Sequence, residues 1–327
     1  MQESNALLEV RNLRTAFNTE TGKVRALDGV SFAVEKGKTL AVVGESGCGK
    51  SVTAMSIMGL VQDANGFVED GQILFEGQNL AALSRDQMRT IRGDRISMIF
   101  QEPMTALNPV YTIGEQIGEV FRIHRGMSRA QAKQEALRML KLVHIPDPHK
   151  RIDEYPFQLS GGMRQRVMIA MALACEPSLL IADEPTTALD VTIQAQILRL
   201  MKELQREKNT AILFITHDLG VVAEMADHVV VMYAGKAVEY GSVYEIFENP
   251  KHPYTKGLLN SIPSSTVTKA QKLFTIDGTV PSLRNLPKGC RFNTRCAHAQ
   301  GRCLEEFPSW ETVSPGHSVA CHFVGKV

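Results

Sequence analysis

The chain has 327 residues, 44% of them hydrophobic, which is enough for one large domain and a smaller one. Its 36 Lys and Arg residues nearly balance 35 Asp and Glu residues, and a net charge of +1 argues against a dominant nucleic-acid-binding surface. The sequence shows no secretory signal pattern and no apolar stretch of about 18 residues, so we predict a cytosolic chain or one peripheral to a membrane.

Two β-rich runs open the chain, in residues 7–17 and 24–34. They flank the polar turn NTETGK, which predicts antiparallel strands joined by a short loop. The first run ends at Phe17, whose ring is by itself equally consistent with a buried strand residue.

A phosphate-binding pattern follows in residues 39–51, TLAVVGESGCGKS. The apolar run 40–43 predicts a buried parallel strand, and Gly-x-x-x-x-Gly-Lys-Ser then matches the P-loop that opens a helix. Such loops turn backbone N–H groups toward phosphate oxygens, the lysine reaches the β- and γ-phosphates, and the serine hydroxyl can ligate Mg²⁺. The predicted nucleotide-binding residues here are Gly44, Glu45, Ser46, Gly47, Cys48, Gly49, Lys50, Ser51 and Val52.

The middle of the chain is predicted to be helical. In residues 128–143 an N-capping Ser128 precedes an apolar stripe that is typical of a core-facing helix. In residues 158–166, QLSGGMRQR, Ser160 is placed to cap a second helix, and the glycines after it let an anion approach the helix N-terminus. An ordinary capped helix explains this segment equally well.

Two further strand ends carry polar residues that suit ATP hydrolysis. The apolar run 179–182 ends in Asp183 and Glu184; the first can hold Mg²⁺ through water, and the second can orient or deprotonate an attacking water. The run 211–216 ends at His217, which by itself could be structural. Gln101, after the apolar run 96–100, gives no signal in isolation.

The order and spacing of these segments resemble the ATP-binding subunit of ABC transporters across roughly residues 7–248. The matching motifs are the P-loop 44–51, the Q-loop Gln101, the signature 159–165, the Walker B strand 179–184, the D-loop 188–190 and the switch His217. The resemblance implies an α/β P-loop NTPase with a RecA-like parallel-sheet core, an antiparallel β layer and a helical subdomain at about 102–172. Residues 249–327 are expected to form a small loop-rich C-terminal region.

The resemblance also implies a mechanism in which two cassettes dimerise head to tail around two ATP molecules. Glu184, His217 and Lys50 are then the expected catalytic residues, and Ser51, Gln101 and Asp183 the expected Mg²⁺ ligands. Phe17 is expected to stack on adenine, and Asp190 to couple the two sites. The residues expected to reach the partner's nucleotide from the signature are Ser160, Gly161, Gly162 and Gln165.

The tail narrows the resemblance to one subfamily. The stretch NPKHPYTKGLLNSIP in residues 249–263 is similar to the D-type ATPases of dipeptide and oligopeptide importers. This implies a second, paralogous ATPase subunit, two transmembrane permease subunits and an external substrate-binding protein, at the cytoplasmic face of a prokaryotic inner membrane. Nickel, opine, glutathione or haem-type substrates remain alternatives, as does a soluble ABC ATPase without a transport role.

Four of the six cysteines lie near the end of the chain, at Cys290, Cys296, Cys303 and Cys321. In a reducing compartment, clustered cysteines favour metal or cluster ligands over disulfides. Their spacing is longer than in zinc knuckles and is compatible with a [4Fe–4S] cluster, which some of the resembling subunits hold in this region. Zinc, with His298, His317 or His322 as a further ligand, and free thiols or a disulfide are the alternatives.

Overall fold

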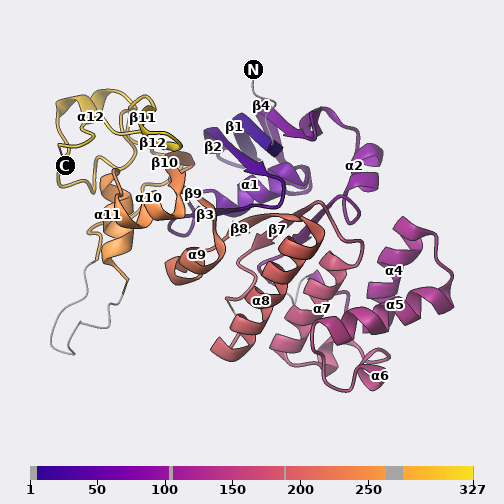
Figure 1. The fold of residues 1–327 in the computed structure, drawn as a ribbon. Coiled ribbons are helices and arrows are strands. Elements are labelled where there is room, and N and C mark those ends of the chain that lie inside the picture. Colours follow the sequence, from indigo (N-terminus) through magenta and orange to yellow (C-terminus); the bar gives the residue numbers. More distant parts are fainter. Residues whose placement is uncertain (1–5, 103–105, 188, 263–274, 327) are drawn as a thin grey trace. The chain divides into compact units, whose positions relative to one another are not determined.

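The computed structural model describes residues 6–102, 106–187, 189–262 and 275–326 (Figure 1). The chain divides into two compact units, which we describe separately. The first consists of Met1–Leu7, Val34–Lys38 and Ala82–Phe214, and the second of Leu8–Ala33, Thr39–Ala81 and Ile215–Val327.

The second unit contains a four-stranded sheet with the strand order β2-β1-β4-β5. Its strands are β1 (Ala6–Thr19), β2 (Gly22–Glu35), β4 (Gly66–Phe75) and β5 (Gln78–Asn79). Strands β1 and β4 are antiparallel, with Val10 opposite Ile73 and Phe17 opposite Gly66. The predicted strands 7–17 and 24–34 are therefore confirmed, and each is longer than the apolar pattern indicated.

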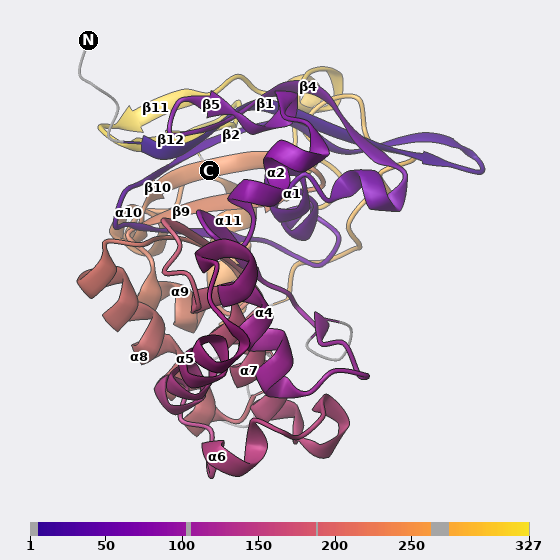
Figure 2. The same cartoon turned by 90° about the vertical axis from the view of Figure 1, so that its right-hand side faces the viewer.

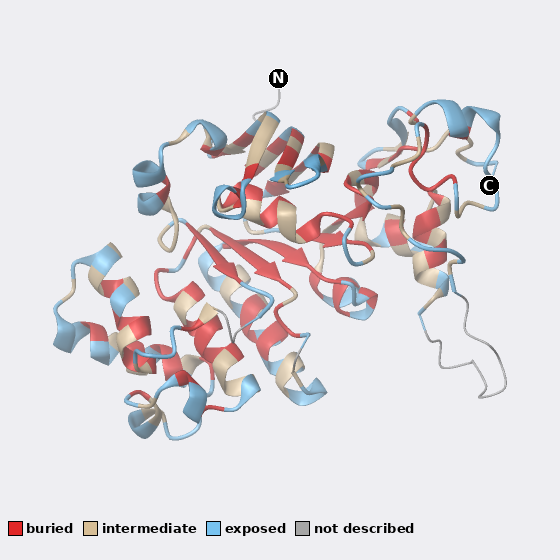
Figure 3. Cartoon of the chain, turned by 180° about the vertical axis from the view of Figure 1, so that it is seen from behind, coloured by how far each residue is buried: buried red, intermediate tan, exposed pale blue. Residues whose placement is uncertain are grey.

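Another sheet region of the second unit positions the P-loop. Strand β3 (Thr39–Val43) pairs in parallel with β9 (His228–Tyr233), and all five of its residues are buried (Figure 3). Next come β10 (Lys236–Ser242), β12 (His317–Val319) and β11 (Glu311–Ser314), all antiparallel. The helices of this unit are α1 (Lys50–Ile57), α9 (Leu219–Met225), α10 (Val243–Glu248), α11 (Pro253–Asn260) and α12 (Gly301–Glu305), with a 3-10 turn η1 (Val61–Ala64).

Because β12 pairs with β10, residues from beyond position 249 extend the same sheet. The division into domains at residue 248 stays a prediction.

The first unit combines parallel strands with a group of helices. Strands β6 (Ile96–Ile99) and β7 (Leu179–Asp183) are parallel neighbours. Strand β8 (Ala211–Ile215) lies on the other side of β7, so the order in the sheet is β8-β7-β6. β8 ends at the unit boundary. These strands are buried, as a sheet covered on both faces requires. The helices are α2 (Arg85–Ile91), α4 (Ile113–Arg125), α5 (Arg129–Leu142), α6 (Pro148–Arg151), α7 (Gly161–Leu173) and α8 (Val191–Lys208), with a 3-10 turn η3 (Pro156–Gln158). A further 3-10 turn, η2 (Leu80–Ala82), spans the boundary between the units.

Helices α4, α5 and α7 pack on one another within the first unit (Figure 2). The predicted capped helix in residues 128–143 is confirmed as α5: Ser128 and Gln131 form a capping box, and Ala132, Ala136 and Leu140 are buried. This agreement follows from local chemistry, because the cap and the apolar stripe both lie within the helix itself.

Across the described ranges, no helix has both the length and the apolar character needed to cross a membrane.

Candidate functional site

The P-loop joins β3 to α1 in the second unit and requires glycine at its ends. Gly44 has φ 152°, and a Cβ there would lie 2.2 Å from the carbonyl oxygen of Met232. Gly49 has φ 106°, and its Cβ would lie 2.7 Å from Leu27 Cδ2. Any side chain at either position would clash with neighbouring atoms, so the pattern seen in the sequence is needed for the loop to lie against β9.

The tip of this loop is open to solvent while its base is buried. Ser46 and Gly47 are exposed, and Cys48 and Gly49 are buried. Helix α1 begins at Lys50 without a side-chain cap, and Ser51 and Val52 are half-buried in its first turn. An uncapped helix start directly after a glycine-rich loop presents backbone donors and the positive end of the helix dipole to an anion.

Lys50 and Cys48 occupy the buried interior of the loop. The Lys50 ammonium donates to the carbonyl oxygens of Gly44 at 2.7 Å and Glu45 at 3.2 Å. Burial raises the pKa of the Cys48 thiol, so Cys48 packs as a neutral side chain, with its Sγ 3.9 Å from Lys50 Nζ. The lysine lies within the loop that would receive the phosphates, and its contact with them stays a prediction.

In the first unit, the structure brings Gln101 and Glu184 together. Asp183 is the buried last residue of β7, and Glu184 follows it with φ 46°, an uncommon conformation for a residue other than glycine. Its Oε2 accepts hydrogen bonds from Gln101 Nε2 at 3.2 Å and Thr187 Oγ1 at 3.1 Å. The Glu184 carboxylate is therefore held in one orientation by two donors.

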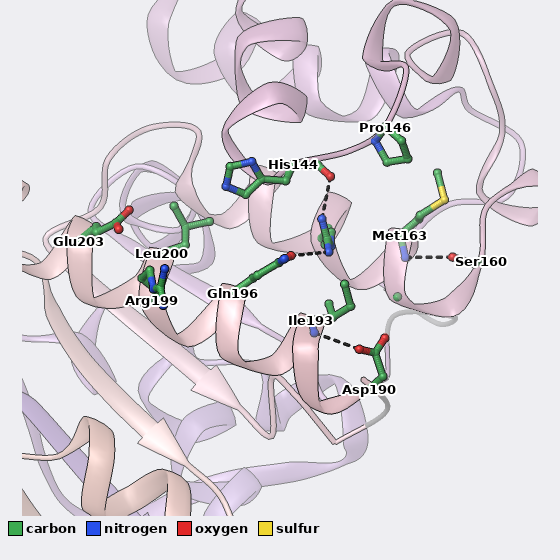
Figure 4. A pocket seen from close by; sticks show the side chains of 12 residues that line it. His144, Pro146, Ser160, Met163, Asp190, Ile193, Gln196, Arg199, Leu200 and Glu203 are labelled. Atoms are coloured by element: carbon green, nitrogen blue, oxygen red, sulfur yellow. Dashed lines mark hydrogen bonds between the residues drawn. The ribbon is translucent and has the colours of Figure 1, made fainter.

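Ser160, Gly162 and Asp190 line one cavity of about 940 Å³ in the first unit (Figure 4). Ser160 caps α7 by accepting from Met163 N at 3.4 Å, and Asp190 caps α8 by accepting from Ile193 N at 3.0 Å. Two helix N-termini thus lie beside the same cavity. Gly161 is exposed at the start of α7, while Ala188 of the predicted D-loop lies outside the described residues.

Gln165 does not face this cavity. It is buried, and its Nε2 donates to the carbonyl oxygen of Pro185 at 2.6 Å, so it links α7 to the segment after β7. Its contact with a nucleotide stays a prediction.

Phe17 and His217 belong to the second unit, with the P-loop. The half-exposed Phe17 ring packs over Gly66, where a Cβ would lie 2.7 Å from Phe17 Cε1. His217 is exposed two residues after the end of β8, and Asp218 beside it caps α9. Glycine at position 66 therefore leaves room for the Phe17 ring, a pairing that sequence reasoning missed.

The four C-terminal cysteines line one small cavity of the second unit, together with Phe292, Phe323 and His252. Burial raises the pKa of Cys290 to about 11, and it also raises the pKa of Cys296 and Cys321. None of the six cysteines forms a disulfide, so the disulfide alternative is wrong for this structure. In the part of the chain that the structure describes, no group of three or more His, Cys, Asp or Glu side chains is arranged to hold a metal ion.

Of the histidines considered as zinc ligands, His298 and His322 line the same cavity, but His317 does not. The buried His317 ring lies 2.8 Å from Glu239 Oε1 and 2.9 Å from Glu245 Oε2, and so joins β12 to β10 and α10. Its predicted part in a zinc site is wrong because these carboxylates already engage both ring nitrogens.

Two residues that sequence reasoning missed contact Glu45 of the P-loop. Arg295 forms a bidentate ion pair with the Glu45 carboxylate, and the Tyr254 hydroxyl accepts a hydrogen bond from the Glu45 backbone N–H. Tyr254 belongs to the HPYT stretch and Arg295 precedes a cysteine, but neither pattern indicates a contact with a loop more than 200 residues away.

Two family models match the chain. One, described as ABC transporter, matches residues 27–187, and the other, described as oligopeptide/dipeptide transporter, C-terminal region, matches residues 238–303. The first contains the P-loop, Gln101, Asp183 and Glu184, and the second contains Tyr254 and Arg295.

Curated relatives match the chain nearly from end to end. A probable peptide ABC transporter ATP-binding protein of Sinorhizobium fredii is 54% identical over 319 residues, covering 98% of this chain and 95% of the relative. The dipeptide transport ATP-binding protein of Bacillus subtilis is 56% identical over 315 residues, covering 96% of this chain and 94% of the relative. An oligopeptide transport ATP-binding protein of the same organism is 54% identical, with 96% and 87% covered.

Solved structures agree with these matches. A dimeric ATP-binding cassette in a post-hydrolysis state with ADP and Pi aligns with a TM-score of 0.66 and 28% identity, covering 72% of this chain and 98% of that one. A subunit of an ABC transporter complex from Clostridium perfringens aligns with a TM-score of 0.61 and 28% identity, with 75% and 91% covered.

Proposed function

Because the chain belongs to the ABC transporter family of ATP-binding proteins, we propose that it hydrolyses ATP to power the import of dipeptides and oligopeptides. The observation that carries this proposal is the nearly full-length similarity, above 50% identity, to proteins named for dipeptide and oligopeptide transport. The match of residues 238–303 to the C-terminal region of such transporters supports it independently of the nucleotide-binding motifs.

The described contacts suit the chemistry of phosphoryl transfer to water. Lys50 and the first turn of α1 stabilise the negative charge that develops on the β- and γ-phosphate oxygens. Glu184, held by Gln101 and Thr187, orients the attacking water and accepts its proton. His217, as the second catalytic residue at a strand end, donates to the γ-phosphate.

Mg²⁺ is implied by this reaction, and the residues proposed to hold it supply hard oxygen donors. These are the Ser51 hydroxyl, the Gln101 amide oxygen and the Asp183 carboxylate, and Asp183 is buried at a strand end, as is typical of such ligands. Bound there, the ion would neutralise phosphate charge.

We further propose that the cavity beside Ser160, Gly162 and Asp190 receives the nucleotide-bearing face of a second, paralogous cassette. Two helix N-termini border it, which suits the phosphates carried by such a partner. Two permease subunits and an external binding protein at the inner membrane complete the proposed importer.

ATP-driven uptake of a labelled dipeptide tests the proposal. In membrane vesicles from a deletion strain, uptake should be absent, and the wild-type chain should restore it while the Glu184→Gln chain should not. If the wild-type chain restores uptake of nickel, an opine, glutathione or haem but of no peptide, the chain serves another importer of the same kind.

For the four-cysteine cavity we propose a [4Fe–4S] cluster. In such a cluster each thiolate binds its own iron, so the ligands need not converge on one point as they do around a single ion. The four thiols border one cavity, whose lining includes the apolar rings of Phe292 and Phe323. When bound, the cluster would supply cross-links between these segments, a structural role; Zn²⁺ is the alternative.

Metal analysis of protein purified without oxygen tests this proposal. We expect about four irons and four acid-labile sulfides per chain. Cys303→Ser should lower both, whereas the matched control Cys175→Ser, at a buried cysteine outside the cavity, should leave them unchanged. Zinc without sulfide would establish the zinc alternative, and the absence of all three would leave four free thiols.

A further inference from the structure

The segment that carries the four C-terminal cysteines, residues 290–321, is here called the cysteine segment. It contacts the P-loop through an ion pair between Arg295 and Glu45. Arg295 Nη1 donates to Glu45 Oε2 at 2.6 Å and Nη2 donates to Glu45 Oε1 at 3.0 Å, which is the bidentate geometry of a strong guanidinium–carboxylate pair. The Arg295 side chain is only 4% exposed and that of Glu45 30%. The pair is therefore largely shielded from water, unlike surface ion pairs, which contribute little.

Arg295 is fixed by other contacts as well. Its Nε donates to the carbonyl oxygen of Asp277 at 2.9 Å, its Nη2 donates to that of Ile276 at 3.1 Å, and its guanidinium lies 5.8 Å from the ring centre of Tyr233. The cation is thus held in place before any ligand binds.

Tyr254 fixes the backbone at the same residue. Its fully buried hydroxyl accepts a hydrogen bond from Glu45 N at 2.8 Å. Its ring packs edge-on against Tyr233, with ring centres 4.7 Å apart, and lies 5.4 Å from Phe292, which belongs to the cysteine segment. Side chain and backbone of the first residue after Gly44 are therefore both held by parts of the chain beyond position 250.

We propose that Arg295 and Tyr254 are positioning residues for nucleotide binding, through which the C-terminal segment keeps the P-loop in its phosphate-binding conformation. The proposal rests on the proposed ATPase function. A loop already ordered before binding loses less conformational entropy when the triphosphate arrives. Arg295 also neutralises a carboxylate that would otherwise repel the triphosphate from within the loop.

The charge argument predicts that substituting Arg295 weakens ATP binding more than substituting Glu45 does. Arg295→Gln leaves the Glu45 carboxylate uncompensated in the loop, so the Kd for ATP should rise about tenfold, as expected for the loss of one strong charge-assisted contact. Glu45→Gln removes the repelling charge along with the pair, so the Kd should rise only about twofold to threefold. Adding Glu45→Gln to Arg295→Gln should therefore recover most of the lost affinity.

The experiment is equilibrium titration of the purified full-length variants with a fluorescent ATP analogue, alongside kcat and KM for ATP hydrolysis. The effect should appear in Kd and KM, with kcat within about twofold of wild type, because a positioning contact acts on ground-state binding. Tyr254→Phe keeps the ring but removes the acceptor, and it should raise the Kd by a smaller factor. The matched control is Arg302→Gln, which breaks an exposed Arg–Glu pair in the same segment and should change nothing.

The outcomes separate this proposal from the ATPase function itself. If wild type binds ATP and Lys50→Ala does not, while Arg295→Gln binds like wild type, the positioning role is wrong and the P-loop site stands. If the losses in Arg295→Gln and Glu45→Gln simply add in the double variant, the pair is not coupled and the proposal also fails. Failure of wild type to bind ATP would overturn the proposed function instead. If Arg295→Gln unfolds, Arg295→Lys, which keeps the charge, should bind ATP with intermediate affinity.

Discussion

Replacing Glu184 with Gln is expected to lower the rate of ATP hydrolysis by about a thousandfold, the effect of losing a general base, while ATP still binds. The substitution removes the charge that accepts the proton of the attacking water. It keeps the shape, and the amide oxygen of Gln can still accept from Gln101 and Thr187, which now hold Glu184 Oε2 at 3.2 and 3.1 Å. The rate of phosphate release at saturating ATP measures the loss of hydrolysis. The Kd for ATP, measured on the same preparation, shows whether the variant still binds ATP.

The matched control is Glu176→Gln in the same unit. Glu176 pairs with Lys208 at 3.1 Å, and its side chain is 48% exposed, so the loss of its charge should leave turnover unchanged. Turnover of Glu184→Gln within about threefold of wild type would show that another group takes the proton, and His217 would be the next candidate.

Replacing Lys50 with Ala is expected to weaken ATP binding by about a hundredfold, the effect of losing two charge-assisted contacts to phosphate oxygens. The ammonium now bonds to the carbonyl oxygens of Gly44 and Glu45, so the variant also loses an internal link of the loop. Titration with a fluorescent ATP analogue measures the loss, and thermal unfolding shows whether the variant remains folded.

Lys36→Ala is the control for this substitution, because Lys36 is an exposed lysine in the turn before β3. Its removal changes the net charge equally but should leave the Kd for ATP at the wild-type value. An unchanged Kd in the Lys50→Ala variant would contradict the assignment of the P-loop as the nucleotide site.

Several parts of the site could be predicted from the sequence because their causes are local. A glycine-rich turn between an apolar strand and a helix can form in few ways, and Gly44 and Gly49 show why: any side chain there meets atoms less than 3 Å away. The caps at Ser160 and Asp190 act on backbone groups three residues further on.

Other features could not be predicted because they depend on residues distant in the chain. The hydrogen bond from the Gln165 amide to Pro185, twenty residues away, is one such feature, because the helical pattern does not indicate which polar side chains turn inward. The convergence of four cysteines on one cavity, and the exclusion of His317 from it, likewise depend on how β12 and the preceding loops pack.

The sequence by itself determined the chemistry: a P-loop, the acidic end of a strand and two helix N-termini are specified by short patterns whose physical causes lie within a few residues. Only the tertiary structure decided what surrounds them. In the sequence, Glu45 occupies one of the four unspecified positions of the P-loop pattern. Folding places it against Arg295, 250 residues away, and against Tyr254, because the buried aromatic cluster of Tyr233, Tyr254 and Phe292 packs the C-terminal segment onto the strand beside β3. No local pattern encodes that contact, since it depends on which apolar surfaces are buried together.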